Sequence, residues 1–325
     1  MTPSAREPAA APRPTIVGTR GSRLATAQTA TVVAALRARH PGLDVRSTVV
    51  STEGDRVTTG PLPSWGRGVF VRDIELAILG GGIDLAVHSL KDVPPELPPG
   101  LALLAIPARA DPGDVLVTAD GRALDALPEG ARVGTSSLRR GAFLLAARPD
   151  LRIVPVRGNV DTRWRKLRES GDYDALVLAA AGLDRLGLAA APRVALPTEV
   201  LLPAPGQGAL ALQGRAGDAY HAGLAGALDD PPTAAAVRAE RRLVRDLDSG
   251  CRLPVSALAT PFPDGRLRLE AAVAAADGRR VLRDAATGRC DDPEALGAAV
   301  ARRLLDAGAG ALLRDAGPVA AGALP

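Results

Sequence analysis

The amino-acid sequence predicts a mixed α/β protein that has two similar α/β domains and a small α+β domain at the C-terminus. Strand-like apolar runs alternate with helical patterns as far as Leu202, one strand–turn–helix unit occurs twice, and the pattern changes after Pro231. Alternation of this kind predicts parallel sheets with helices on both faces. A chain of 325 residues is long enough for two or three domains with a large buried core.

The first domain is predicted to begin with a strand at 15–19 and a helix from Ser22 to Arg39, which His40-Pro41-Gly42 ends. The pattern then predicts a strand at 45–51, a helix at 69–79, and strands at 83–90 and 101–106. The segment 203–208 is too rich in Pro and Gly for a helix or strand, so we expect it to cross between domains. A strand at 208–213 is then expected to return to the first sheet.

The repeated unit is a strand that ends in Val-Gly-Thr and leads through serine into a helix. It occurs at Val17-Gly18-Thr19 and at Val133-Gly134-Thr135, the second time followed by a helix at 138–147 and a strand at 151–156. In each half a strand led by an aspartate comes later, at 83–87 and at 173–177. The repeat indicates either a duplicated domain or a chance match in a chain rich in Ala and Val.

The pattern after Pro231 is that of a small α+β domain. It predicts a helix at 233–247, a loop that holds Cys251, two or three strands between Pro254 and Thr287, and a helix at 293–313. The expected division of the chain is a disordered tail at 1–14, a first domain at 15–110 plus 203–228, a second domain at 111–202 and a C-terminal domain at 229–325.

The composition argues against several classes of protein. Forty Lys and Arg against thirty-six Asp and Glu leave a net charge of +4, too small to predict binding to nucleic acid or to a membrane surface. No apolar run approaches the roughly 18 residues of a membrane helix, and residues 1–14 lack the apolar core of a signal peptide. Two cysteines and three dispersed histidines argue against a disulfide framework and a metal site. We expect a cytoplasmic protein without a metal.

The two Val-Gly-Thr turns are candidate anion sites, because a helix that begins at a strand tip presents free backbone N–H groups there. Ser22 and Ser136 or Ser137 are expected to cap these helices, which is also the purely structural interpretation. Arginines accompany both turns: Arg20 beside the first, and Arg139 and Arg140 beside the second. The sequence contains neither a G-x-G-x-x-G segment nor a Gly-rich loop ending in Gly-Lys-Ser/Thr, which disfavours a nucleotide ligand.

Arginines recur at or just beyond the ends of the predicted strands, where open α/β sheets place their ligands. Of the forty basic residues only Lys91 and Lys166 are lysines, so an Arg-rich genome is the simple explanation for any single arginine. Their common position nevertheless indicates a carboxylate-rich or phosphate-rich ligand between the domains, since arginine binds such groups bidentately. The arginines in this position are Arg20, Arg139, Arg140, Arg157, Arg163 and Arg185.

The segment His88-Ser89-Leu90-Lys91-Asp92-Val93-Pro94 follows an apolar strand, so its side chains are expected to emerge into a cleft. A surface ion pair between Lys91 and Asp92 is the structural alternative. A carboxylate at a strand tip beside cations would instead be ionised and placed for proton transfer or for stabilising a cation. Cys251 lies between Gly250 and a nearby proline, which predicts a loop, whereas Cys290 is expected to be an inert packing residue.

These segments together resemble the porphobilinogen deaminase family, also called hydroxymethylbilane synthase, from about Ile16 to about Leu313. No single motif decides the resemblance, but their ordered set is specific. The motifs are Gly18-Thr19-Arg20-Gly21-Ser22, Gly68-Val69-Phe70, His88 to Pro94, Gly134 to Arg140, Arg157-Gly158-Asn159-Val160, Pro205-Gly206-Gln207-Gly208-Ala209 and Gly250-Cys251. The resemblance implies three domains, of which the first two are similar to periplasmic binding proteins, and a monomer.

The resemblance implies a transferase that deaminates four porphobilinogen molecules and joins them into hydroxymethylbilane. By this resemblance Cys251 would carry the family's dipyrromethane cofactor through a thioether, and Asp92 would be the catalytic carboxylate that assists loss of ammonia and stabilises the azafulvenium cation. The residues implied to bind the cofactor's carboxylates are Ser89, Lys91, Thr135, Ser137, Arg139 and Arg140. Those implied to bind incoming or elongating pyrroles are Arg20, Ser22, Arg157, Arg163 and Arg185.

Two positions depart from the family pattern. Arg67 stands where a lysine is common, which keeps the charge but not the shape, and Trp65 stands where a small residue is expected. Arg67 and Phe70 would belong to a lid-like segment.

Because neighbouring helical residues do not share a face, Arg139 and Arg140 are expected to serve different carboxylates.

Two other functions compete with this interpretation. A non-catalytic two-lobed protein that binds a dicarboxylate or oxyanion would also use helix N-termini facing a cleft, but it would not need a third domain with a loop cysteine. A hydrolase with a cysteine nucleophile would need a general base near Cys251, and the sequence around it offers none.

Overall fold

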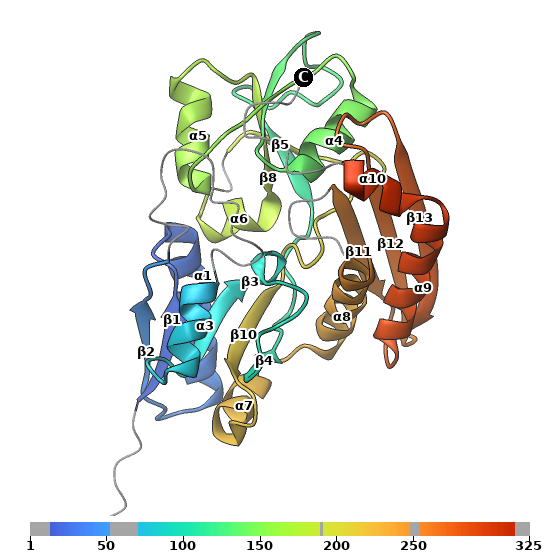
Figure 1. Ribbon diagram of the computed structural model, residues 1–325. Helices are drawn as coiled ribbons and strands as arrows, with labels where there is room; N and C mark the ends of the chain where they lie inside the picture. Colours follow the sequence, from blue (N-terminus) through green and yellow to red (C-terminus); the bar gives the residue numbers. More distant parts are fainter. Residues whose placement is uncertain (1–13, 53–70, 189–190, 248–253, 316–325) are drawn as a thin grey trace, which may run out of the picture.

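The computed structural model describes residues 14–52, 71–188, 191–247 and 254–315. The described strands form three sheets, two of five strands and one of three, which occupy separate parts of the molecule (Figure 1). The mixed α/β fold class is therefore confirmed. No helix within the described ranges is long and apolar enough to span a membrane.

The first sheet has the strand order β2-β1-β3-β10-β4. Its strands are β1 (Thr15–Thr19), β2 (Val45–Val49), β3 (Leu85–Ser89), β4 (Leu101–Ala105) and β10 (Leu210–Arg215). The described helices that accompany them are α1 (Arg23–Arg39), α3 (Arg72–Leu79) and α7 (Ala219–Gly226). The prediction that the strand after residue 208 returns to the first sheet is confirmed, and Figure 1 shows β10 in yellow beside the blue and cyan strands.

The second sheet has the order β7-β6-β8-β5-β9. Its strands are β5 (Asp114–Val117), β6 (Arg132–Gly134), β7 (Arg152–Val154), β8 (Ala175–Ala179) and β9 (Arg193–Ala195). The accompanying helices are α4 (Leu138–Ala147), α5 (Val160–Glu169) and α6 (Ala180–Arg185). The two Val-Gly-Thr strands, β1 and β6, occupy the same place in the two sheets, each between two parallel neighbours.

The prediction of purely parallel sheets is wrong in one respect, because β10 and β5 run antiparallel to their neighbours. The reason lies in where the chain crosses between sheets. Leu210 of β10 pairs with Ser89 at the end of β3, and Asp114 of β5 pairs with Ala179 at the end of β8. Each crossing segment thus reaches its sheet at the carboxyl edge, and the strand that follows must run away from that edge.

The third sheet is antiparallel, with the order β11-β12-β13. It consists of β11 (Val255–Pro261), β12 (Arg266–Ala274) and β13 (Val281–Arg289), covered by α8 (Pro231–Asp246), α9 (Pro293–Asp306) and α10 (Ala309–Asp315). The single helix expected at 293–313 is two helices, because Gly308 adopts φ +96°, which a helix cannot contain. Cys290 is half-buried and packs against this core, as expected.

The third sheet packs directly on the second. Ala272 and Ala274 of β12 belong to the same apolar cluster as Phe143 of α4. Arg283 of β13 adds a polar contact, since its Nη2 donates to the Glu199 carbonyl at 2.7 Å while its guanidinium lies 5.7 Å from the Phe143 ring centre. The second sheet therefore shares a core with the C-terminal part of the chain.

Gly208 is required where the chain crosses back to the first sheet. Its φ is +85°, and a Cβ there would meet the backbone oxygen of Ala110 and, at 2.9 Å, that of Asp111. Gly171 also has a positive φ, +67°, but open space around its Cα. We expect Gly208→Ala to lower the free energy of unfolding by about 3 kcal/mol and Gly171→Ala by about 1 kcal/mol, because only the first adds a backbone clash to the conformational strain. Urea unfolding measures both, and equal losses would contradict this explanation.

Candidate functional site

The site lies at the carboxyl edges of the first two sheets, where both crossing segments pass. β3 continues directly into a single 3-10 turn, η1 (Leu90–Asp92), which places Lys91 and Asp92 just beyond the edge. The Lys91 Nζ donates to Oε1 of Gln207, a residue of the return crossing, at 3.2 Å. Burial lowers the pKa of Lys91 to about 8, and the nearby charge of Arg140 adds to the effect.

Arg139 and Arg140, in the first turn of α4, converge on the buried carboxylate of Asp114. Arg139 Nη2 donates to Oδ2 at 2.7 Å, and Arg140 Nη2 donates to Oδ1 at 2.7 Å. Their places on the helix do not keep the two guanidinium groups apart, because the long side chains bend to opposite oxygens of one aspartate. That they bind different carboxylates of a ligand stays a prediction. These cations hold the pKa of Asp114 well below its usual range, against the opposing effect of its burial.

Asp92 faces cations from both sheets. Burial has the largest effect on the pKa of both cations, and it lowers the pKa of Arg163 to about 10. The negative charge of Asp92 acts in the opposite direction and favours the protonated form of Lys91 and of Arg163. No hydrogen bond or ion pair joins Asp92 to another residue of the described part of the chain. The alternative of a surface Lys91–Asp92 pair is therefore wrong, and the Asp92 carboxylate is left available to a ligand.

The serine and threonine hydroxyls at the two turns have structural partners. Ser22 caps α1 by accepting from the Ala25 N–H at 3.2 Å, and Ser137 caps α4 by accepting from the Arg140 N–H at 3.4 Å. The capping predictions are thus confirmed for these two residues. Thr135 is buried, and its Oγ1 accepts from the Ser137 N–H at 3.2 Å.

Ser136 does not cap a helix; its hydroxyl donates to the Val156 carbonyl at 2.8 Å. Ser89, at the end of β3, exchanges hydrogen bonds with the Gln28 side chain of α1, at 3.0 and 3.2 Å. His88 beside it is fully buried and bonded to Gln213 Oε1 at 2.9 Å. Burial lowers the pKa of His88 to about 4, so this imidazole is neutral near pH 7.

The remaining arginines lie around the same edges, but not all at strand tips. Arg20 follows β1 and is close enough to His88 to contribute to its lowered pKa. Arg157 lies between β7 and α5, whereas Arg163 is within α5 and donates to the Gly158 carbonyl at 2.7 Å. Arg185 ends α6 and donates to the Gly208 carbonyl at 2.7 Å. Arg163 and Arg185, like Arg139 and Arg140, therefore lie beyond the strand ends, on the helices that follow the strands.

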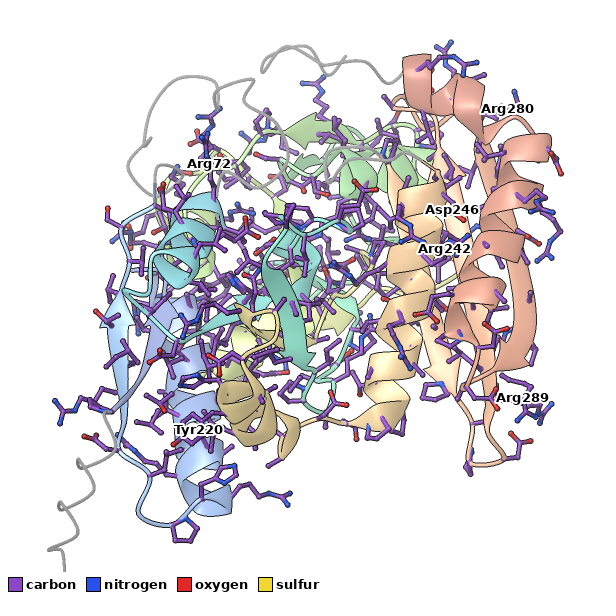
Figure 2. All side chains as sticks on the ribbon, turned by 60° about the horizontal axis from the view of Figure 1, so that its bottom comes forward. Arg72, Tyr220, Arg242, Asp246, Arg280 and Arg289 are labelled. Carbon is purple, nitrogen blue, oxygen red and sulfur yellow. The ribbon has the colours of Figure 1, made fainter. Side chains whose placement is uncertain are left out.

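Three predicted site residues, Arg67, Phe70 and Cys251, lie outside the described residues, as does the expected tail except its last residue. The described residues that flank Cys251 in sequence are Leu247, just after α8, and Pro254, just before β11. Near the end of α8 two charged side chains pair with each other. There Arg242 Nε donates to both oxygens of Asp246, at 2.8 and 2.7 Å (Figure 2).

Comparison with known proteins decides the family. Residues 15–222 match the model of the porphobilinogen deaminase dipyrromethane cofactor-binding domain, and residues 234–306 match that of the porphobilinogen deaminase C-terminal domain. The chain belongs to the porphobilinogen deaminase family. Porphobilinogen deaminase of Desulforudis audaxviator is 51% identical over 302 residues, covering 93% of this chain and 97% of that protein. That of Roseiflexus castenholzii is 51% identical over 298 residues, covering 91% and 97%.

Among solved structures, the methionine-binding protein MetQ aligns with 65% of this chain and 87% of its own, with a TM-score of 0.43 and 15% identity.

The family membership gives the site its ligand chemistry. Four cations, Lys91, Arg139, Arg140 and Arg163, lie at the edge with the carboxylates of Asp92 and Asp114, an excess of two positive charges. We call these four the basic cluster. Its chemistry fits the carboxylate-bearing dipyrromethane cofactor of porphobilinogen deaminases.

Several residues that organise the porphobilinogen deaminase site were missed from the sequence. From the sequence alone, Asp114 and Glu240 would be expected at the surface, as acidic residues usually are, yet both are buried. Glu240 pairs with Arg109 at 2.6 Å and accepts from the Gly206 N–H at 2.6 Å, so it ties both crossings to α8. Gln207 stands within the family motif Pro205-Gly206-Gln207-Gly208-Ala209, and its place between two glycines was the available signal for a role.

Proposed function

We propose that this chain is a hydroxymethylbilane synthase, which deaminates four porphobilinogen molecules and joins them head to tail with release of ammonia. The observation that carries the proposal is the Asp92 carboxylate, which makes no hydrogen bond or ion pair with the described residues, beside a basic cluster with excess positive charge. Family membership supplies the substrate class and the dipyrromethane cofactor. We also propose that the enzyme is a cytoplasmic monomer, as the resemblance to the family implies.

The basic cluster would hold carboxylates. Arg139, Arg140 and Lys91 are assigned to the cofactor, with Ser89, Thr135 and Ser137 lining the same edge. Arg20, Ser22, Arg157, Arg163 and Arg185 are assigned to the incoming and elongating pyrroles. Guanidinium groups suit this task because they remain charged and bind carboxylates through paired hydrogen bonds.

Asp92 is assigned the proton and charge chemistry. Loss of ammonia from porphobilinogen leaves a delocalised cation, and an ionised carboxylate held close to it lowers the energy of that state. The same carboxylate can accept the ring proton that is lost after each coupling. The cations nearest to this carboxylate include Lys91 and Arg163, which lie close enough for the charge of Asp92 to raise their own pKa values against the larger effect of burial.

Cys251 is assigned as the attachment point of the cofactor, which when bound supplies the nucleophilic pyrrole carbon to which new units are joined. The sequence places Cys251 a few residues after α8, which ends at Asp246. Glu240 ties α8 to the crossing that carries Gln207, so α8 itself is held next to the basic cluster.

The experiment that tests the function follows porphobilinogen and ammonia together. Purified protein given porphobilinogen is expected to release one ammonia for each molecule consumed and to form a linear tetrapyrrole. Binding of porphobilinogen without consumption would contradict the enzyme assignment and favour the two-lobed binding protein.

The pKa of Lys91 predicts how cofactor assembly depends on pH. Because the pKa of Lys91 is lowered to about 8, its ammonium loses the proton as the pH rises through 8, and the carboxylate it would bind then lacks a partner. We expect the rate of cofactor assembly on the apoprotein to fall about tenfold for each pH unit above 8. The fall is expected to end at the pH that equals the pKa of Lys91 in the cofactor-bound protein. Intact mass against time at pH 7 to 10 measures it. Lys91→Arg, which stays charged, is the control; if it slows to the same extent, Lys91 is not responsible.

A further inference from the structure

Asp114, the first residue of β5, is a fully buried acid at the site that accepts four side-chain hydrogen bonds, and no role has been assigned to it. Its side chain has no exposed surface. Besides the two arginines, Gln207 Nε2 donates to its Oδ1 at 3.0 Å. A buried carboxylate with this many donors remains ionised, and its position in turn fixes the groups that donate to it.

Asp114 and two backbone carbonyls use only some of the N–H groups of the two guanidiniums. A guanidinium has five N–H groups. Arg140 gives Nε and Nη2 to Asp114 and Nη1 to the Val177 carbonyl, so two of its five N–H groups have no partner among the described residues. Arg139 gives Nη1 to the Leu202 carbonyl and Nη2 to Asp114, which leaves three. The unused donors are therefore held in fixed directions.

The contacts continue across the boundary between the two sheets. Asp114 follows the first crossing, and Gln207 belongs to the return crossing. Gln207 Nε2 also donates to the Pro112 carbonyl at 2.7 Å, while its Oε1 accepts from Lys91 Nζ. One continuous chain of hydrogen bonds thus joins Lys91 of the first sheet to Arg139 and Arg140 of the second.

We propose that Asp114 is a positioning residue for the cofactor: it orients Arg139 and Arg140 and, through Gln207, keeps Lys91 in register with them. The proposal rests on the function proposed above. Asp114 touches no cofactor atom itself in this role; it acts through the two arginines and through Gln207.

Charge explains why one buried aspartate is needed. Lys91, Arg139 and Arg140 are three cations in a buried region, and they repel one another. The charged groups that act on Lys91 are Arg140 and Arg139, which oppose its protonation, and Asp92 and Asp114, which favour it. Removal of the Asp114 charge would leave the two arginines uncompensated beside Lys91.

The test uses full-length protein in a Cys251→Ser background, so that bound cofactor does not differ between variants. Asp114→Asn keeps the shape and removes the charge. The matched control is Asp84→Asn, since Asp84 is also buried and arginine-paired, to Arg215 at 3.0 Å, but precedes β3 at its other end. Each protein is acetylated with acetic anhydride over a range of pH, and Lys91 is quantified by peptide mass spectrometry. Lys166, the other lysine of the chain, is the internal reference.

We expect Asp114→Asn to lower the pH of half-labelling of Lys91 by about one unit, and Asp84→Asn to leave it unchanged. The same pH in Asp114→Asn and in the parent would overturn the proposal. Should Asp114→Asn fail to fold, Gln207→Leu decides, because it breaks the link to Lys91 and keeps both arginine pairs. Gln207→Leu is expected to lower the pH of half-labelling of Lys91 as well. An unchanged pH of half-labelling in Gln207→Leu would overturn the proposed link from Asp114 through Gln207 to Lys91.

Cofactor loading gives the second measurement, in proteins that retain Cys251. Folded Asp114→Asn is expected to carry at least about tenfold less adduct than Asp84→Asn, because the arginines lose their orientation. Equal loading of the two variants would contradict the positioning role. If wild-type protein carries no adduct, the proposed function fails while the Lys91 labelling still decides the role of Asp114, so the two failures are distinguishable.

Discussion

Asp92→Asn is expected to fold, to carry the cofactor and to lose porphobilinogen turnover by about a hundredfold or more. The half-buried Asp92 side chain makes no hydrogen bond or ion pair with the described residues, so an amide of the same shape costs little stability. The amide can neither stabilise a cation nor accept a proton at neutral pH. Turnover is measured on protein whose cofactor content has been checked by intact mass.

The control for this variant is Asp174→Asn, which also removes a half-buried aspartate. Asp174 pairs with Arg132 at 3.1 Å where β8 begins, at the opposite edge of the second sheet. Its turnover is expected to match wild type. Asp92→Glu keeps the charge but moves it by about one methylene, and a displacement of about 1 Å can cost about a hundredfold. Wild-type turnover in loaded Asp92→Asn would rule out the catalytic role.

Arg140→Leu is expected to reduce cofactor loading at least about tenfold, because the buried Asp114 would lose one of its two arginine partners and the cofactor one of its donors. Arg163→Leu is expected to load normally and to slow elongation, since Arg163 bonds to the Gly158 carbonyl and not to Asp114.

Loading is measured by intact mass and elongation by tetrapyrrole formation from porphobilinogen. Equal loading of the Arg140 and Arg163 variants would contradict the division of the arginines between cofactor and substrate. Loss of loading in Arg163→Leu alone would reverse the assignment of the two residues.

Local patterns predicted most of the helices and strands because local chemistry determines them. The helix at 138–147 has the predicted bounds, and the one predicted from Ser22 begins at Arg23 with Ser22 as its cap. The direction of β5 and β10 could not be predicted in this way. It depends on which edge of a sheet the crossing segments reach, a property of the tertiary structure.

The position of Lys91 and Asp92 just beyond a strand could be predicted because they directly follow an apolar run, and the structure places both in the turn after β3. Asp114 and Glu240 could not be found, since an aspartate at the start of a strand or a glutamate within a helix is ordinarily exposed. Only the assembled fold shows that two arginines and a glutamine from distant segments surround Asp114. The same packing explains why Arg139 and Arg140 share one carboxylate when helix geometry alone separates them.

The most direct measurement is the intact mass of the purified protein beside that of Cys251→Ser. Wild type is expected to exceed its sequence mass by two linked pyrrole units, and Cys251→Ser to have its sequence mass alone while remaining folded. Cys290→Ser, which changes the other cysteine, is expected to keep the adduct. An active wild-type protein of unmodified mass, or an adduct that persists in Cys251→Ser, would contradict the assignment of Cys251 as the cofactor anchor.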